Sequence, residues 1–95
     1  MIVRLWRATI DPGRAEEYER FANERSLPMF RSHSGFQGCA FLRDGADRTV
    51  ITLWASAEDA AALEISDRYR ETVAAIMAAG FIQTAEEAVT GQALV

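Results

Sequence analysis

The sequence predicts an α+β domain in which a four-stranded antiparallel sheet carries two helices on one face. Two observations predict it: strand and helix patterns follow one another in the order β-α-β-β-α-β, and the first strand is apolar on both faces. We expect a single domain over residues 1–95, because domains typically hold about 100–150 residues and this chain has 95.

The first strand spans residues 2–10, where β-branched and aromatic side chains recur on both faces. Arg4 falls on one face of this strand and Arg7 on the other. At least one of the two therefore points toward a covered surface, where a guanidinium needs an anionic partner from the protein or from a ligand. The turn at residues 11–13 ends the strand, and Asp11 is placed to cap a helix.

The first helix shows an apolar stripe at a spacing of three and four residues, formed by Ala15, Tyr18, Phe21, Ala22 and Arg25. Pro28 interrupts this helix, because proline has no N–H to donate and disfavours a helix interior. We expect residues 29–31 to form a short irregular turn on the core.

The second half of the chain begins with two strands, residues 36–43 and 48–54, joined by a hairpin at residues 44–47. Ser56 then caps a second helical region, with Asp59 three residues further on. A break is expected at Ser66 and Asp67, Gly80 ends the region, and residues 86–95 give the last strand.

This order of elements is typical of the ferredoxin-like fold. Two helices cover only one face of such a sheet, and the other face is too apolar for open water. A large exposed apolar face usually marks an interface. We therefore expect a homodimer, packed sheet to sheet, with a cavity for a small aromatic or apolar ligand between sheet and partner.

Composition excludes several classes of protein. The net charge is −4 and the arginines are scattered, whereas proteins that bind nucleic acid usually carry a basic stripe. Cys39 is the only cysteine, so the chain forms no internal disulfide. No apolar run approaches the roughly 20 residues that a membrane span needs, and the N-terminus lacks a signal-peptide pattern. We expect a cytoplasmic protein.

The chain resembles the antibiotic biosynthesis monooxygenase family of the dimeric α/β-barrel superfamily. The resemblance rests on MIVRLWR at residues 1–7, on SLPMFRSHSGFQG at residues 26–38 and on TLWASAEDAAALEISDRYRETV at residues 52–73. It implies a cofactor-independent monooxygenase that oxidises a small aromatic phenol or quinol with molecular oxygen. The alternatives on the same scaffold are a non-catalytic ligand-binding or accessory module and a lactone isomerase or cyclase.

The resemblance also implies which residues form the site. Bulky and cationic side chains would bind the aromatic body and its oxygen: Trp6, Trp54, Arg4, Arg7, Phe41 and Tyr69. Tyr18 and Tyr69 lie on helical stripes, so we expect each in the core or in the cavity lining, with its hydroxyl available for orientation. Haem-degrading members match Trp54, but they need an asparagine where this chain has Leu5 or Trp6, and a histidine where it has Val73. Haem degradation is therefore not expected.

His33 is the only histidine and thus the candidate general base. The competing interpretation is a solvated loop residue. One histidine and one cysteine do not supply the three or four ligands of a metal site, so no metal is expected. No phosphate-binding, flavin or nicotinamide motif occurs, and no cofactor is expected either.

Overall fold

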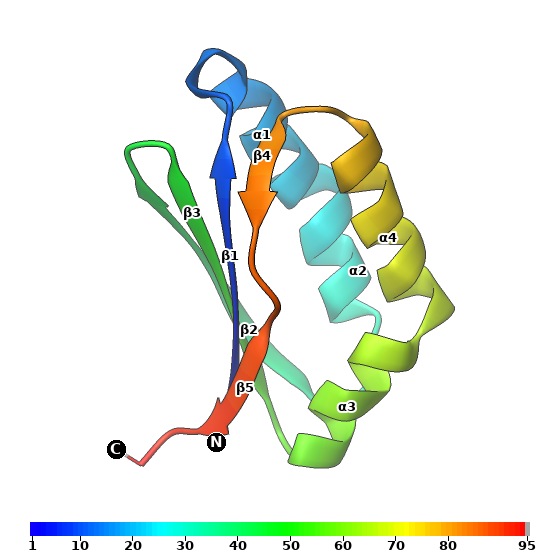
Figure 1. Cartoon of the computed structure of the whole chain (residues 1–95). Helices are drawn as coiled ribbons and strands as arrows, with labels where there is room; N and C mark the ends of the chain where they lie inside the picture. The colour runs from blue at the N-terminus through cyan, green and yellow to red at the C-terminus, as the bar shows by residue number, and fades with distance from the viewer. Residues whose placement is uncertain (95) are drawn as a thin grey trace.

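An antiparallel sheet with all helices on one side makes up the protein (Figure 1). The computed structural model describes residues 1–94. The strands lie in the order β2-β3-β1-β4, and β5 also pairs with β1. The predicted α+β fold is confirmed. The strands are β1 (Ile2–Ile10), β2 (Phe36–Asp44), β3 (Asp47–Trp54), β4 (Ile82–Ala85) and β5 (Val89–Gln92).

Strand β1 lies inside the sheet and gives its two faces different surroundings. It pairs with β3 from Ile2 opposite Trp54 to Thr9 opposite Asp47. Side chains alternate between the faces of a strand, and only the even-numbered side chains of β1 reach the helices. Arg4 is therefore buried, whereas Arg7 is exposed on the face without helices.

The last edge of the sheet differs from the prediction. Instead of one strand over residues 86–95, β4 and β5 pair separately with β1, so the sheet has five strands rather than four. The three residues 86–88 lie opposite only two residues of β1, Trp6 and Arg7. The outer edge therefore has one extra residue, which interrupts the ladder of strand pairs as a β-bulge. Val95 lies outside the described residues.

Pro28 does not end the first helical segment, which corrects the predicted turn at residues 29–31. Helical conformation continues through η1 (Pro12–Arg14), α1 (Ala15–Phe21), the π-helical η2 (Ala22–Ser26) and α2 (Leu27–Arg31). The π turn of η2 ends two residues before Pro28 and adds one residue to the helix. It changes the local hydrogen-bond pattern, and a regular α-helical pattern at this point is one that proline cannot complete, because it has no N–H. The extra residue also places Ser26, rather than the predicted Arg25, on the buried face.

The second helical region follows the prediction. Ser56 caps α3 (Ala57–Ile65), and Ser66 breaks the region and caps α4 (Asp67–Ala78). Each serine hydroxyl accepts a hydrogen bond from the backbone N–H three residues on, at 3.1 and 3.0 Å. Only Ile76 of α4 is buried, so this helix is held by few apolar contacts.

Two apolar clusters form the core between the sheet and the helices. One gathers around Trp54 and the other around Phe81.

Among residues 1–94, no helix is long and apolar enough to cross a membrane.

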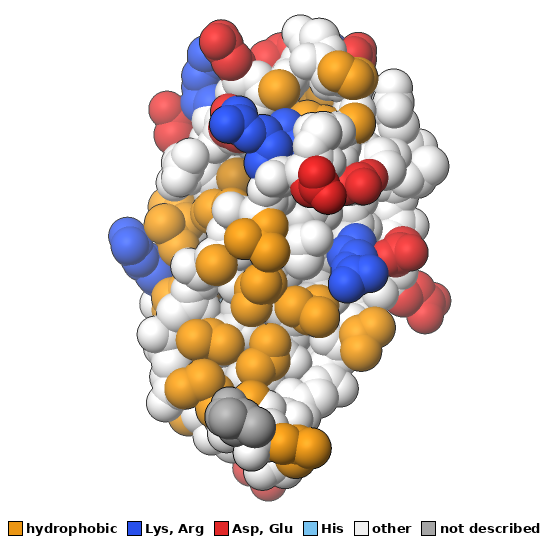
Figure 2. Space-filling model, turned by 90° about the vertical axis from the view of Figure 1, so that its left-hand side faces the viewer, with side chains coloured by type: hydrophobic (Ala, Val, Ile, Leu, Met, Phe, Trp, Pro, Cys, Tyr) orange, Lys and Arg blue, Asp and Glu red, His pale blue; other side chains and the backbone are white. Residues whose placement is uncertain are grey.

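The other face of the sheet is open and largely apolar. Figure 2 shows hydrophobic side chains gathered over its middle and lower part, with charged side chains toward the upper end. By strand register, this face carries Val3, Leu5, Leu42, Ile51, Leu53 and Val89. Leu42 and Val89 are more than half exposed. We call these six residues the open apolar face.

Candidate functional site

An apolar cavity of about 40 Å³ lies between the sheet and the helices, where the two core clusters meet. Strands β1, β2 and β3 supply its floor, and α1, η2, α2 and α4 supply its roof. The lining residues are Arg4, Trp6, Tyr18, Ala22, Ser26, Met29, Phe30, Phe41, Val50, Tyr69, Thr72, Val73 and Ile76. This cavity is on the helix side of the sheet, so it is distinct from the cavity predicted between the sheet and a second copy.

Arg4 is the one charged side chain in this lining. Its guanidinium is 4% exposed, and its Nε donates a hydrogen bond to Glu64 Oε1 at 3.2 Å. Its Nη2 donates to the Tyr69 hydroxyl at 2.6 Å, and its Cζ lies 4.9 Å from the centroid of the Tyr69 ring. Glu64 is 46% exposed, and among residues 1–94 it is the only carboxylate that pairs with this buried cation, so water screens the pair.

A chain of contacts fixes Tyr69 in place. The backbone N–H of Tyr69 donates to Ser66 Oγ, the cap of α4. His33 Nε2 lies 2.7 Å from the same oxygen, and His33 Nδ1 lies 2.8 Å from the carbonyl oxygen of Met29. Since a carbonyl only accepts, Nδ1 carries a proton, and His33 ties the end of α2 to the start of α4.

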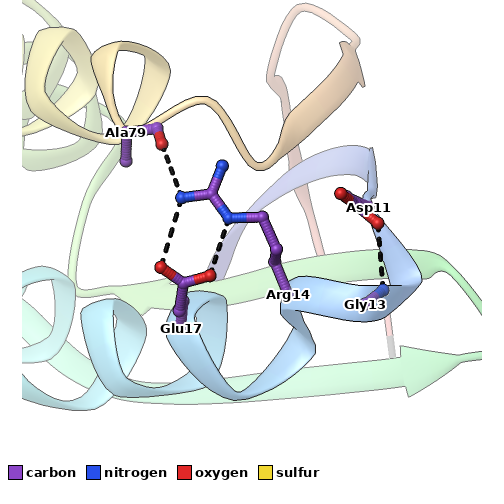
Figure 3. A network of polar contacts seen from close by, with 5 residues as sticks. All are labelled: Asp11, Gly13, Arg14, Glu17 and Ala79. Atoms are coloured by element: carbon purple, nitrogen blue, oxygen red, sulfur yellow. Dashed lines mark hydrogen bonds and ion pairs between the residues drawn. The ribbon is translucent and has the colours of Figure 1, made fainter.

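The opposite end of α4 is tied down by Arg14 (Figure 3). Arg14 Nη2 donates to the carbonyl oxygen of Ala79 at 2.8 Å, which satisfies an unpaired carbonyl at the helix end. Arg14 also holds Glu17 through two hydrogen bonds, of 2.6 and 3.2 Å. These bonds lower the pKa of the Glu17 carboxyl. Polar contacts at both ends therefore hold the helix that roofs the cavity.

A surface groove of about 370 Å³ adjoins the cavity and shares Arg4, Trp6 and Tyr69 with it. Its outer wall is the bulge at residues 86–88, together with Glu64. The three shared side chains thus lie between the cavity and the groove. Bulges are common beside functional sites, because they bend a strand edge and redirect its side chains.

Four of the predicted site residues meet at this cavity: Arg4, Trp6, Phe41 and Tyr69. Arg7 lies on the other face of β1, in a polar hollow of about 460 Å³. Trp54 is fully buried beside the cavity but is not part of its lining, and its Nε1 donates to Thr52 Oγ1 at 2.8 Å. His33 also lies outside the lining, where it makes the contacts described above.

Tyr18, which its helical stripe predicted for the core or the cavity lining, does line the cavity, because α1 turns that stripe toward the sheet. Ser26 and Glu64 were not among the predicted site residues. Ser26 reaches the cavity only through the π turn, and Glu64 only because α3 passes the end of Arg4. No local pattern in the sequence indicates either of them.

The lining contains no histidine, cysteine, aspartate or glutamate. Cys39 packs against the Trp54 cluster, and burial raises the pKa of its thiol to about 11. The thiol is therefore protonated at neutral pH and is a poor nucleophile. Within residues 1–94, no three His, Cys, Asp or Glu side chains come together in a way that could hold a metal ion.

Comparison with known proteins gives a family match. Residues 1–75 match the family described as antibiotic biosynthesis monooxygenase. No curated protein matches the chain.

Solved structures share the fold at low sequence identity. A variant of SnoaB, a cofactor-independent oxygenase from Streptomyces nogalater, superposes with a TM-score of 0.80 at 18% identity, over 99% of this chain and 93% of that one. Rv0793 from Mycobacterium tuberculosis has a TM-score of 0.77 at 11% identity, over 99% and 95%. A structure described as an antibiotic biosynthesis monooxygenase has a TM-score of 0.77 at 13% identity, over the whole of both chains.

Proposed function

Because the chain belongs to the antibiotic biosynthesis monooxygenase family, we propose that it oxidises a small aromatic phenol or quinol with molecular oxygen and without a cofactor. The observation that carries this proposal is the buried Arg4 guanidinium in the wall of an otherwise apolar cavity. An aromatic body fits such a lining, and a cation at its edge favours an oxyanion.

Arg4 binds the substrate oxygen in this proposal and favours its ionised form. A phenolate is a better electron donor than a phenol, so holding the anion makes transfer to oxygen easier. Glu64 neutralises Arg4 only in part, because its carboxylate is almost half exposed. Tyr69 orients the guanidinium through its 2.6 Å hydrogen bond.

The substrate itself supplies the four electrons that the reaction consumes. One oxygen atom enters the ring as a quinone carbonyl, and the other leaves as water with two protons from the substrate. The protein binds the ring, holds the anion and excludes water, and the apolar side chains of Trp6, Phe41 and Val50 serve that purpose.

The size of the cavity requires that its roof moves when a substrate binds. A cavity of about 150 Å³ holds benzene, whereas this one measures about 40 Å³. Helix α4 is loosely packed for its length, since Ile76 is the one buried residue among its 12. We propose that α4 swings outward about the break at Ser66, and that ligands enter through the groove beside Arg4, Trp6 and Tyr69.

Oxygen uptake with anthrone-type and quinol substrates tests this function. Arg4→Met should lower kcat/KM by roughly 10–100-fold, because a hydrogen bond to a charged group contributes about 1.5–3 kcal/mol. Arg7→Met is the matched comparison, since it removes the same charge from the other face of β1. Uptake no faster than in buffer, or a larger loss with Arg7→Met than with Arg4→Met, would overturn the proposal.

The second candidate is a non-catalytic module that binds a small apolar ligand. It is favoured by the lining, which lacks any histidine or carboxylate for proton transfer. Tight binding of the same aromatics without oxygen uptake would identify it.

A lactone isomerase or cyclase needs a histidine or a carboxylate to carry a proton. If the protein has that activity, His33→Ala should abolish turnover.

We also propose that the protein is a homodimer that packs through the open apolar face. Helices cover the other face of the sheet, and the open apolar face carries six apolar side chains from β1, β2, β3 and β5. Exposed patches of this kind usually mark an interface, because burying them removes apolar surface from water.

A further inference from the structure

Tyr18 brings a free hydroxyl to the cavity. The side chain is 2% exposed, and its hydroxyl makes no hydrogen bond within residues 1–94. Arg48 Nε is the only side-chain nitrogen or oxygen of these residues that is fully enclosed without a partner. The Tyr18 hydroxyl therefore borders open space, and Tyr18 lines both the cavity and a separate hollow of about 50 Å³ beside α1.

Tyr18 and Arg4 line the cavity at different levels of the sheet. Arg4 pairs with Thr52 across the sheet, and Ala8 pairs with Arg48. The Arg48 guanidinium lies 5.7 Å from the centroid of the Tyr18 ring. Arg4 and Ala8 are four positions apart along β1, so their Cα atoms are separated by roughly 13 Å. Apolar side chains make up most of the rest of the lining.

Arg48 lies outside the cavity lining, but its guanidinium makes the surroundings of Tyr18 electropositive. Arg48 is 3% exposed, and its Nη1 donates to the carbonyl oxygens of Gly45 and Asp47 at 2.7 and 2.9 Å. No carboxylate of residues 1–94 forms an ion pair with it, so its positive charge is not neutralised locally. Burial raises the pKa of Tyr18 to about 12, which keeps its O–H available as a donor at neutral pH.

We propose that the Tyr18 hydroxyl donates a second hydrogen bond to the substrate. The site then selects quinol-type aromatics, with an oxygen at each end, over phenols with one oxygen. This inference rests on the proposed function, in which Arg4 binds the first oxygen. Ser26 is the competing donor, because its hydroxyl also lines the cavity without a hydrogen bond to residues 1–94.

Anaerobic calorimetry with two matched ligand pairs tests the inference without turnover. The pairs are phenol with hydroquinone and 2-naphthol with 2,6-dihydroxynaphthalene, so that both ligand length and oxygen number vary. We expect the unmodified protein to bind the dioxygenated member of at least one pair about tenfold more tightly, the effect of one hydrogen bond. Tyr18→Phe should remove that preference and leave binding of the one-oxygen partner unchanged.

Tyr18→Phe keeps the edge-to-face contact with Phe81, whose ring centroid lies 5.9 Å away, so the fold should survive. Ser26→Ala is the matched control and should retain the preference. A preference that survives Tyr18→Phe, or that Ser26→Ala removes instead, overturns the inference. Equal binding of both members of each pair also overturns it but leaves the proposed function standing. Absence of binding by all four ligands overturns both.

Discussion

Arg4 and Arg7 carry the same charge on the same strand, and their positions in the strand alternation decide what each can do. Arg4 faces the helices and is enclosed with Glu64 and Tyr69, so it can act on a bound ligand. Arg7 faces solvent in the single chain. The sequence puts them on opposite faces, but which face the helices cover is decided only by packing.

Gly35 is a residue whose replacement should be costly for two separate reasons. Its φ of +80° lies in the left-handed region, which L side chains rarely adopt. A Cβ at this position would also overlap the carboxylate of Asp59, which accepts a hydrogen bond from the cap of α3, Ser56. The turn before β2 and the start of α3 therefore depend on the same glycine.

We expect Gly35→Ala to lower the free energy of unfolding by about 2–4 kcal/mol, from left-handed strain together with damage to the helix cap. Gly45→Ala is the control, because its φ is +59° but no atom lies within 4 Å of an added Cβ. It should cost only the backbone strain of about 1 kcal/mol. Urea denaturation measures both, and equal losses would contradict the steric part of the argument.

At the scale of elements, irregularities bring the site together. The π turn of η2 turns Ser26 inward, and the bulge at residues 86–88 forms the outer wall of the groove. The break at Ser66 separates α4 from α3, and α4 depends on polar contacts at both ends. A strictly regular helix or strand would place these side chains elsewhere.

The contact of Arg14 with Glu17 predicts a pH dependence of stability. Arg14 lowers the pKa of the Glu17 carboxyl below its ordinary 4.5, so the folded state favours the ionised form. The stabilisation is present above about pH 4.5 and is lost as pH falls through the lowered pKa. Glu17→Gln should therefore be less stable than the unmodified protein at neutral pH, and the two should converge in acid.

Thermal unfolding followed across the acid range measures this convergence. Glu16→Gln is the control, because it removes the same charge from an exposed residue that forms no ion pair within residues 1–94. Its stability should follow that of the unmodified protein throughout. If Glu17→Gln is less stable than the unmodified protein by the same amount at every pH, the carboxylate charge is not the cause of that difference.

At the scale of the whole molecule, the open apolar face leads to a prediction about assembly. Ile51 lies within this face, paired with Leu5 on one side and Ala40 on the other. Ile51→Arg should convert a dimer of twice 10.5 kDa into a monomer of 10.5 kDa. A buried charge without a partner costs several kcal/mol, enough to separate the two copies.

Light scattering after size exclusion distinguishes the two masses. Ile65→Arg is the control, because Ile65 is 69% exposed on α3, away from the sheet. It should remain dimeric. A monomeric unmodified protein at micromolar concentration, or a dimeric Ile51→Arg variant, would contradict packing through this face.

The sequence by itself determined the α+β fold, the order of its elements up to the last edge of the sheet, and the family. Alternation of apolar side chains in strands and their spacing of three and four in helices are local consequences of backbone geometry. They can therefore be recognised without knowing how the elements pack together. The same patterns place Trp6 and Arg4 together on one face of β1. The break before α4 also followed from Ser66 and Asp67 alone.

Only the tertiary structure decided where the cavity lies and which residues share it. Tyr18, Ser26 and Tyr69 come from separate helices, and they meet because those helices pack on the same face as Arg4. The bulge at residues 86–88 likewise arises where β4 and β5 pair with the distant strand β1. Such contacts leave no periodic signal in the sequence, because side chains far apart along the chain become neighbours only when the chain folds.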